Sequence, residues 1–554
     1  MSEKQKRTRS LAGIAGIVAI ATLISKVFGL VRQQAIAAAF GVGPAFDAYN
    51  YAYVIPGFLL ILLGGINGPF HSAIVSVLAK RKAEEAAPLV ETITTLVGSL
   101  LLIVTVILVI FADPLMSVVA PGLDISAAEA AAEGIDPEKF QTLQLTQAIA
   151  IRQFRIMAPL AVLAGLIGIG FGTLNAADQY WLPSISPLFS SVAVIGALGI
   201  FVVQVGSNVS LPQYATIGGM VLAGGTLAGA LLQWLAQVFA QWRSGLGTLR
   251  LRFEFNRPGV KDVMKVMGPA TLSSGMLQIN VYTDLFFASY IPQAAAALGY
   301  AGLLVQTPLG IISNMLLVPL LPVFSRLADP QDWPELKQRI RQGLILTALT
   351  MLPLGALMIT LAVAIVRVVY ERGAFDPAAS AFVAPMLMAY GVGMFVYLGR
   401  DVLVRVFYAL GDGETPFRVS VVNIFLNALL DFLLVNAFGA PGLVLATVGV
   451  NIISMVTLLV LLHRKLHGLP LLAWSQPVAL LSGASVLAGF AGWGILHGCE
   501  QLIAPVGLPI QFVQLSVAGF GGLGVFALCA TQLKLPEVDI FVERVRQRFS
   551  RRSG

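Results

Sequence analysis

Long apolar blocks recur from one end of the chain to the other, separated by short polar stretches. A helix needs about 20 apolar residues to cross a bilayer, and each block is at least that long. The blocks therefore predict an all-α polytopic membrane protein with fourteen transmembrane helices. The predicted spans lie near residues 11–40, 46–78, 89–112, 146–174, 182–204, 213–241, 261–291, 295–325, 342–368, 379–410, 416–437, 440–463, 473–496 and 510–532.

Composition agrees with this pattern and excludes several classes of function. The chain is 57% hydrophobic and 11% charged, whereas a soluble domain is about 25% charged, so no large soluble domain is expected. The net charge of +7 is spread over short loops and both tails, which is typical of a membrane protein and predicts no nucleic-acid partner. "GDGETP" lacks the GK[ST] ending of a phosphate-binding loop, and four histidines form no catalytic motif. The sequence predicts a transporter rather than an enzyme.

Lys and Arg concentrate in alternate loops, and the cytoplasmic loops of membrane proteins carry the excess of these residues. "KRK" (Lys80 to Lys82), "HRKLHG" and the tail "VERVRQRFSRRSG" fall on the same side as the basic N-terminus "MSEKQKRTR". The loop "GLDISAAEAAAEGIDPEKFQ" falls on the other side and is acidic. We therefore predict that both termini are cytoplasmic.

The second and eighth predicted spans resemble each other. Each has a proline near its start, a flexible small or polar middle, a second proline and a basic exit. An offset of six spans is even, so the repeats are expected to be parallel, as in transporters that rock one lobe against another. This predicts an N-lobe at 1–245 (spans 1–6), a C-lobe at 246–466 (spans 7–12), and a C-terminal part at 467–554 with spans 13 and 14 and a basic cytoplasmic tail.

Three charges lie in or beside the first two spans, namely Lys26, Arg32 and Asp47. A charge at the centre of a membrane helix costs about 2.5–3.5 kcal/mol on insertion scales. One interpretation is structural, with side chains that reach the interface or an Arg32–Asp47 pair. The other is a cationic site in a water-filled cavity. Arg offers a planar fork that matches phosphate oxygens, so Arg32 beside Lys26 predicts an anionic, phosphorylated substrate.

A second polar group lies on the later spans. Asn423, Asn427 and Asp431 follow each other at i, i+4 and i+8 and share one face of a helix. Asp284 lies in the seventh span and Thr447 in the twelfth. Carboxylate, amide and hydroxyl oxygens suit a hard cation such as Na⁺. An interhelical hydrogen-bond cluster explains the same residues equally well. No other cofactor is expected.

The tenth span carries Arg400 and Arg405 with Asp401 between them. The two arginines either line the substrate cavity or pair within their lobe. Their place near the cytoplasmic end favours a structural or interfacial role.

Several motifs resemble those of the MurJ/MviN family of lipid II flippases. They are "SKVFGLVRQQAIAAAFGVGPAFDAYNYAY", "APGL", "GTLNAADQYWLPSISP", "YERGAFD" and "FYALGDGETP", in this order along the chain. The resemblance implies two six-helix lobes with two extra C-terminal helices. It implies transfer of lipid II, the lipid-linked peptidoglycan precursor, from the inner to the outer leaflet of the bacterial plasma membrane by alternating access. Such a role in cell-wall biogenesis and cell shape implies lipid partners, a monomer, and contact with the cell-wall machinery.

The resemblance also implies site residues. The family's sodium ligands match Asp284, Asn427, Asp431 and Thr447, with a backbone carbonyl near Leu443. The family's arginine on the first span is kept as Arg32. At two positions where the family usually carries charge, this chain has Leu60 and Leu303. The less positive cavity leaves open an alternative function, the export of another lipid-linked oligosaccharide or amphiphile.

Overall fold

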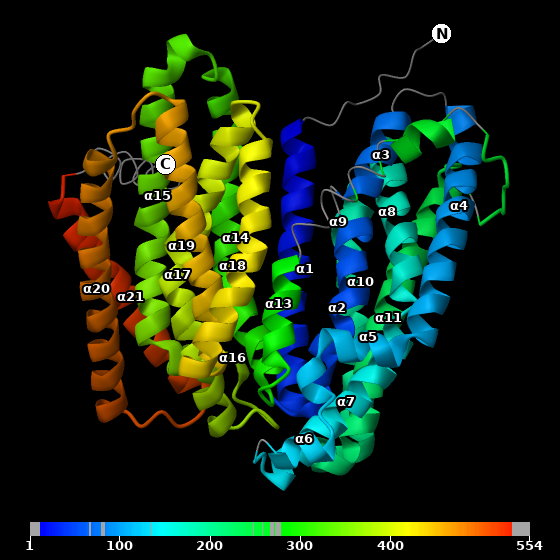
Figure 1. Ribbon diagram of the computed structural model, residues 1–554, viewed down its shortest axis with the longest axis horizontal. Helices are drawn as coiled ribbons and strands as arrows, with labels where there is room; N and C mark the ends of the chain where they lie inside the picture. Colours follow the sequence, from blue (N-terminus) through cyan, green and yellow to red (C-terminus); the bar gives the residue numbers. More distant parts are fainter. Residues whose placement is uncertain are drawn as a thin grey trace, which may run out of the picture. The chain divides into compact units, whose positions relative to one another are not determined.

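The computed structural model describes residues 11–65, 68–78, 83–132, 134–247, 249–256, 259–265, 267, 271 and 279–534 (Figure 1). Every regular element in these ranges is helical, which confirms the all-α prediction. Eleven helices in the described ranges are long and apolar enough to cross a membrane, or twelve if a bent pair counts as one span. The predicted total of fourteen stays a prediction. The basic N-terminus, the Lys80–Lys82 cluster, residues 266, 268–270 and 272–278 of the seventh span, and the basic tail lie outside the described residues.

The chain divides into two compact units. The first contains Met1–Ala296 and Arg372–Phe375, and the second contains Ala297–Glu371 and Asp376–Gly554. This division follows contacts between residues, whereas the predicted lobes follow the sequence repeat. The lobe boundaries after residues 245 and 466 therefore stay predictions.

The first unit is a bundle of long helices with short connecting helices around them. Its elements are α1 (Leu11–Phe40), α2 (Pro44–Gly64), α3 (Pro69–Leu78), α4 (Ala83–Ile110), α5 (Ala112–Val119), α6 (Ala127–Ala132), α7 (Pro137–Met157), α8 (Leu160–Ala176), α9 (Trp181–Ile185), α10 (Pro187–Val205), α11 (Pro212–Arg243) and α13 (Ile279–Ala288).

The fourth predicted span is bent. It corresponds to α7 and α8, which meet at an angle of 41°. Pro159 lies between the two helices and has no backbone N–H to continue the hydrogen-bond ladder. The first predicted span, by contrast, ends at the same residue as α1, Phe40.

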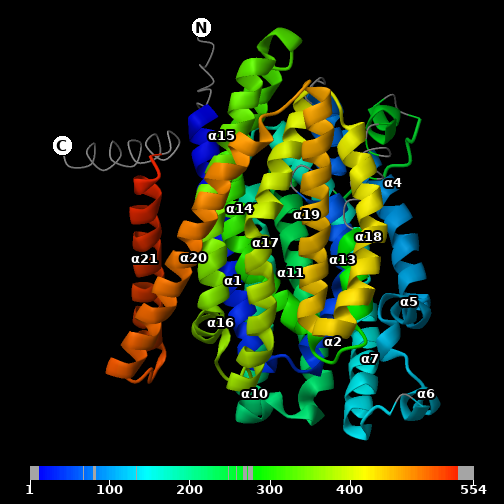
Figure 2. The ribbon, with the colours of Figure 1, turned by 60° about the vertical axis from the view of Figure 1, so that its left-hand side comes forward.

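The second unit is built from longer helices. They are α14 (Ala294–Arg326), whose first three residues cluster with the first unit, α15 (Trp333–Thr360), α16 (Ala362–Tyr370), α17 (Pro377–Ala409), α18 (Glu414–Phe438), α19 (Ala440–Lys465), α20 (Leu471–Leu502) and α21 (Leu508–Gln532). Figures 1 and 2 show α20 and α21 side by side at the edge of this unit. Leu481, Ala484 and Ala488 of α20 are buried in one apolar cluster with residues of α15 and α21. The two added C-terminal helices are thus packed onto the unit through hydrocarbon contacts.

A loop from late in the chain docks on the end of α1. The Ala374 N–H donates to the Ala38 carbonyl oxygen at 2.8 Å. Gly373 has φ +58 and Gly41 has φ +54, a conformation that costs a residue with a Cβ about 1–2 kcal/mol. A Cβ on Gly373 would overlap the Ala38 carbonyl oxygen, and one on Gly41 would overlap the Ala374 carbonyl oxygen. The contact therefore requires glycine at both positions.

We predict that Gly373→Ala lowers the thermal stability of the purified protein more than Gly411→Ala does. Gly411 also has a positive φ, at +73, but a Cβ there would meet open space. Both substitutions strain the backbone. Only Gly373→Ala also forces a Cβ against the Ala38 carbonyl oxygen, and such overpacking costs about 1–3 kcal/mol. Thermal unfolding followed by tryptophan fluorescence gives the comparison. Equal melting temperatures for the two variants would show that the docking contact does not stabilise the fold.

Candidate functional site

Arg32 lies on α1 and is half-buried. Its Nε atom is inaccessible to solvent and has no hydrogen-bond partner among the described residues. Its charge interacts with the phenol groups of Tyr49 and Tyr53 on α2. A buried donor on a cation is costly unless a partner arrives, so this side chain is suited to receive an anionic ligand.

The two tyrosines of α2 that interact with the charge of Arg32 belong to an aromatic stack. The ring centroids of Phe46 and Tyr49 are 6.0 Å apart, and those of Tyr49 and Tyr53 are 5.4 Å apart with nearly parallel planes. Residues three and four apart share one helix face, which explains the ladder. The Tyr49 hydroxyl lies 3.0 Å from the Thr226 hydroxyl of α11, and this contact fixes the stack.

A cavity of about 190 Å³ opens beside the stack, within the first unit. Its lining includes Asn50, Tyr53 and Gly57 of α2 and Tyr282 of α13. A side chain at Gly57 would overlap the Tyr53 ring, so glycine here leaves room for that ring. The cavity offers amide and phenol groups for hydrogen bonds and aromatic faces for apolar contact. The charge of Arg32 interacts with Tyr53, and Tyr53 lines the cavity, so Arg32 and the cavity lie in the same part of the first unit.

The structure separates the three charges that the sequence groups together. Lys26 is exposed, and it lies six residues from Arg32 on α1, which places the two side chains on different faces of the helix. Asp47 is 2% exposed. Its two carboxylate oxygens accept the N–H groups of Gln293, at 3.1 Å, and Ala296, at 2.9 Å. These N–H groups belong to the start of α14, where a carboxylate is stabilising.

No ion pair joins Asp47 to Arg32 in the described part of the chain. Asp47 therefore holds the first turn of α14 on the first unit.

The polar face of α18 is buried in the second unit. The Asn427 amide donates to Asp431 Oδ2 at 2.7 Å, and both side chains are essentially inaccessible. Asn423, one turn earlier, is also buried. The one-face prediction for these residues agrees with their common burial. The pair supplies amide and carboxylate oxygens, which are the ligand types that a hard cation prefers.

Thr447 lies on α19, which packs along α18. A Cβ on Gly442 would overlap the Leu434 carbonyl, and one on Gly449 would lie 3.2 Å from the Leu430 side chain. These close approaches bring residues 443–448 of α19 alongside 430–434 of α18, the stretch that contains Asp431. Asp284 belongs to α13 of the first unit, so the predicted ligand set is divided between the two units. The described residues hold no cluster of three or more His, Cys, Asp or Glu side chains that could bind a metal ion.

Arg400 and Arg405 bond within the second unit. Arg400 donates from Nε to the Ser454 hydroxyl at 3.0 Å and from Nη2 to the Ser420 hydroxyl at 3.4 Å. Arg405 donates from Nη1 to the Leu317 carbonyl at 3.1 Å. Each guanidinium thus ties α17 to neighbouring helices, which agrees with the structural interpretation of these residues.

The "GDGETP" motif forms a capped turn between α17 and α18. Asp412 accepts hydrogen bonds from the Thr415 N–H at 3.0 Å and from Lys465 Nζ at 2.6 Å. Burial alone would raise the pKa of Asp412, but the bonds from Lys465 and Thr415 outweigh burial and hold the pKa below its ordinary value. The motif therefore has a structural explanation. It connects the end of α17 to the start of α18, and Asp412 bonds to Lys465 at the end of α19.

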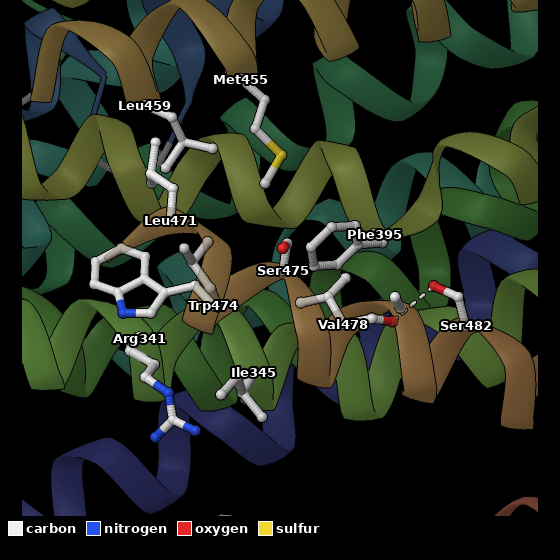
Figure 3. Close-up of a pocket in the computed structure, with 12 residues that line it drawn as sticks. Arg341, Ile345, Phe395, Met455, Leu459, Leu471, Trp474, Ser475, Val478 and Ser482 are labelled. Atoms are coloured by element: carbon white, nitrogen blue, oxygen red, sulfur yellow. Dashed lines mark hydrogen bonds between the residues drawn. The ribbon is translucent and has the colours of Figure 1, made fainter. Parts of the chain in front are cut away.

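Sequence reasoning missed an apolar cavity in the second unit. It has a volume of about 390 Å³ and is lined by α15, α17, α19 and α20, including Phe395, Met455, Trp474 and Val478. Figure 3 shows these side chains, with the Arg341 guanidinium pointing away from the Trp474 indole.

The hydroxyl groups of this cavity are already engaged. Ser482 donates to the Val478 carbonyl at 2.8 Å, marked by the dashed line in Figure 3, and Ser475 donates to the Leu472 carbonyl at 3.0 Å. The walls are therefore suited to hydrocarbon rather than to a polar headgroup. No sequence signal reports this cavity, because it forms only where four helices meet.

Comparison with known proteins identifies the family. The family model described as "Lipid II flippase MurJ" matches residues 36–513. A probable lipid II flippase MurJ of Synechocystis sp. is 58% identical over 551 residues, covering 100% of both chains. The lipid II flippase MurJ of Burkholderia cenocepacia is 29% identical over 498 residues, covering 88% of this chain and 89% of that protein.

Solved structures show the same fold. A lipid II flippase MurJ in an inward closed conformation superposes with a TM-score of 0.71 at 20% identity, covering 94% of this chain and 99% of that one. A multidrug resistance transporter of the MATE family, in an inward-facing conformation, superposes with a TM-score of 0.56 at 16% identity, covering 83% and 99%. The multi-pass helical fold is thus the fold of transporters. The match of the family model to residues 36–513 and the identity of 58% over the full length of a relative show that this chain belongs to the MurJ family of lipid II flippases.

Proposed function

We propose that this protein moves lipid II, the lipid-linked peptidoglycan precursor, from the inner to the outer leaflet of the plasma membrane. Family membership and the end-to-end relation to a probable lipid II flippase support this function. The observation that carries it is Arg32, a half-buried cation whose Nε has no hydrogen-bond partner among the described residues. A pyrophosphate would provide that partner through a charge-assisted bond.

We propose that the substrate headgroup binds in the first unit, at Arg32 and the neighbouring cavity. Tyr53 and Asn50 line that cavity and supply groups that can hydrogen-bond sugar hydroxyls. Lys26 is exposed on another face of α1 and serves as a separate attraction for anionic headgroups. Arg400 and Arg405 keep a structural role in this proposal, because their guanidinium groups already bond within the second unit.

Asp47 acts indirectly in this proposal. Its carboxylate is occupied by the N–H groups at the start of α14, and a negative charge at the headgroup site would repel pyrophosphate. We assign it the positioning of α14 rather than contact with the substrate.

A second candidate function, export of another lipid-linked oligosaccharide, is favoured by Leu60 and Leu303. Leu60 packs against the buried apolar cluster of the first unit, so this position contributes to the core and not to a charged site.

Rescue of a bacterial strain depleted of its own lipid II flippase distinguishes the two functions. Growth with this chain as the sole flippase supports lipid II as cargo, and failure at normal membrane abundance favours the second function.

Arg32→Ala should abolish this rescue while leaving insertion and folding intact. The substitution removes charge-assisted hydrogen bonds, each worth roughly 1.5–3 kcal/mol. Arg32→Lys should rescue only in part, because an ammonium replaces a bidentate fork. The control is Arg418→Ala, which removes an exposed arginine of α18 and should rescue fully. Full growth with Arg32→Ala at normal abundance would exclude the pyrophosphate role.

We propose that Asp431 and Asn427 hold Na⁺, with Thr447 as a further ligand and a backbone carbonyl near Leu443, while the assignment of Asp284 stays a prediction. The buried amide and carboxylate of α18 support this set. A bound Na⁺ would neutralise the buried charge of Asp431 and so stabilise the packing of α18 against α19.

Sodium should therefore raise the melting temperature of the purified protein, since a ligand present at 100 times its dissociation constant stabilises the folded state by about 2.7 kcal/mol. Asp431→Ala should remove the gain. Asn436→Ala, which alters an exposed residue of the same helix, should keep it. A gain that potassium reproduces equally, or that persists in Asp431→Ala, would identify a plain hydrogen-bond cluster.

We propose a plasma-membrane location with both termini in the cytoplasm, a monomeric protein, and contact with the cell-wall machinery. The bacterial sources of the relatives and the loop charges support the location.

Ala131→Cys, in the acidic loop, should then react with an impermeant thiol reagent added outside intact cells. Ser244→Cys, at the end of α11, should react only after the membrane is opened. Both variants are made in a Cys499→Ser, Cys529→Ser background. Labelling of Ser244→Cys from outside, with Ala131→Cys protected, would show that the predicted orientation is wrong.

A further inference from the structure

The segment that follows α11 has an exposed apolar face with a period of two. It reads "LRLRFEF" over residues 249–255 and is not helical, with a bend at Leu249 and a turn at Phe255. Leu249, Leu251, Phe253 and Phe255 are 56%, 72%, 67% and 39% exposed. Between them, Arg252 Nη1 donates to Glu254 Oε1 at 3.2 Å, so these two charged side chains share one side of the segment. The rings of Phe253 and Phe255 also contact each other, with centroids 5.9 Å apart.

The opposite side of this segment is fixed to α4. The Arg252 N–H donates to the Thr95 hydroxyl at 3.0 Å, and Arg252 Nε donates to Glu91 Oε2 at 2.6 Å. The Glu91 side chain is only 7% exposed, and a carboxylate buried to this extent needs such a partner. Gly247 brings the backbone close to α4, because a Cβ there would lie 3.4 Å from the Ala87 carbonyl.

The attachment point lies where the lipid-facing part of α4 begins. Figure 1 shows the segment as the green loop beside the start of this helix. Beyond Thr95, α4 carries no charged residue. Its large exposed side chains there are apolar, namely Leu100, Leu102, Ile103, Val106, Ile107, Val109 and Ile110. In a membrane protein such a face is covered by lipid.

The segment also continues an exposed aromatic pair at the end of α11. Phe239 and Trp242 are 56% and 62% exposed, with ring centroids 6.0 Å apart. Trp and other aromatic side chains concentrate where helices leave the membrane. The segment thus follows an exposed aromatic pair in the chain, at the end of α11, and is bonded to α4, the helix that carries the exposed apolar residues.

We propose that residues 249–255 are a membrane-interface anchor, with Leu251 and Phe253 inserted among the lipids and Arg252 holding the segment to α4. A strand from a partner protein is the alternative occupant of an exposed segment in which apolar residues alternate with charged ones. Lipid is favoured because the neighbouring exposed faces of α4 and α11 are apolar. The anchor fixes the first part of the connection between α11 and α13 to the membrane surface, and this inference does not depend on the cargo.

Spin labels on the full-length protein in liposomes of phosphatidylethanolamine and phosphatidylglycerol test the anchor. Single cysteines replace Arg250, Leu251, Phe253 and Glu254 in a Cys499→Ser, Cys529→Ser background, and collision with oxygen is compared with collision with a water-soluble nickel complex. Labels at 251 and 253 should favour oxygen, and labels at 250 and 254 should favour nickel, so the preference changes sign with a period of two.

Two reference positions calibrate this measurement. Leu100→Cys reports lipid on α4, and Ala131→Cys reports water in the acidic loop. Labels at 251 and 253 that match Ala131 would show a segment in water, and labels shielded from both reagents would show a protein partner. Either result overturns the proposal.

Arg252→Ala tests the role of the attachment. Without the bonds to Glu91 and Thr95, the labels at 251 and 253 should lose their oxygen preference relative to the parent. Arg250→Ala, which removes an exposed arginine two residues away, should leave it unchanged. An unchanged preference in Arg252→Ala would show that the attachment to α4 does not orient the segment.

Discussion

Hydrocarbon offers no hydrogen-bond partner, so every polar group inside the membrane must find its partner within the chain. The helices satisfy their own backbone, and many hydroxyl groups do the same. Thr92, Thr173 and Thr347 each donate to the carbonyl oxygen four residues earlier, at 2.8 Å. These hydroxyl groups thus form their hydrogen bonds within their own helix. The few buried polar groups with other arrangements are the ones that distinguish this protein from a bundle of apolar helices.

These exceptions fall into two kinds. Asp47 bonds to the start of a helix, Arg400 to a neighbouring helix and Glu91 to the segment after α11, and each contact fixes local geometry. Arg32 differs, since its buried Nε has no partner in the described part of the chain. The same physical constraint therefore separates charges that bond within the fold from the charge to which we assign a ligand in our proposal.

Backbone contact has a comparable role at the end of α1. Gly41 and Gly373 allow a loop and a helix end, more than 300 residues apart in the sequence, to approach at the distance of a hydrogen bond between backbones. This explains physically why the "FGVGP" and "YERGAFD" motifs contain glycine. Together with the Asp47 bonds to the start of α14, these contacts gather later parts of the chain around the α1–α2 corner.

The sequence by itself determined the helical membrane fold, the position of α1 and the common face of Asn423, Asn427 and Asp431, because block length and helical period are local properties. It also carried the motifs of the family. The tertiary structure alone decided that Asp47 bonds to the first residues of α14, that Arg252 holds its segment to α4, and that four helices leave an apolar cavity beside Trp474. A charge in a membrane span signals that a partner is required, but periodicity does not encode which distant residue provides it. That choice depends on which helix faces meet after folding.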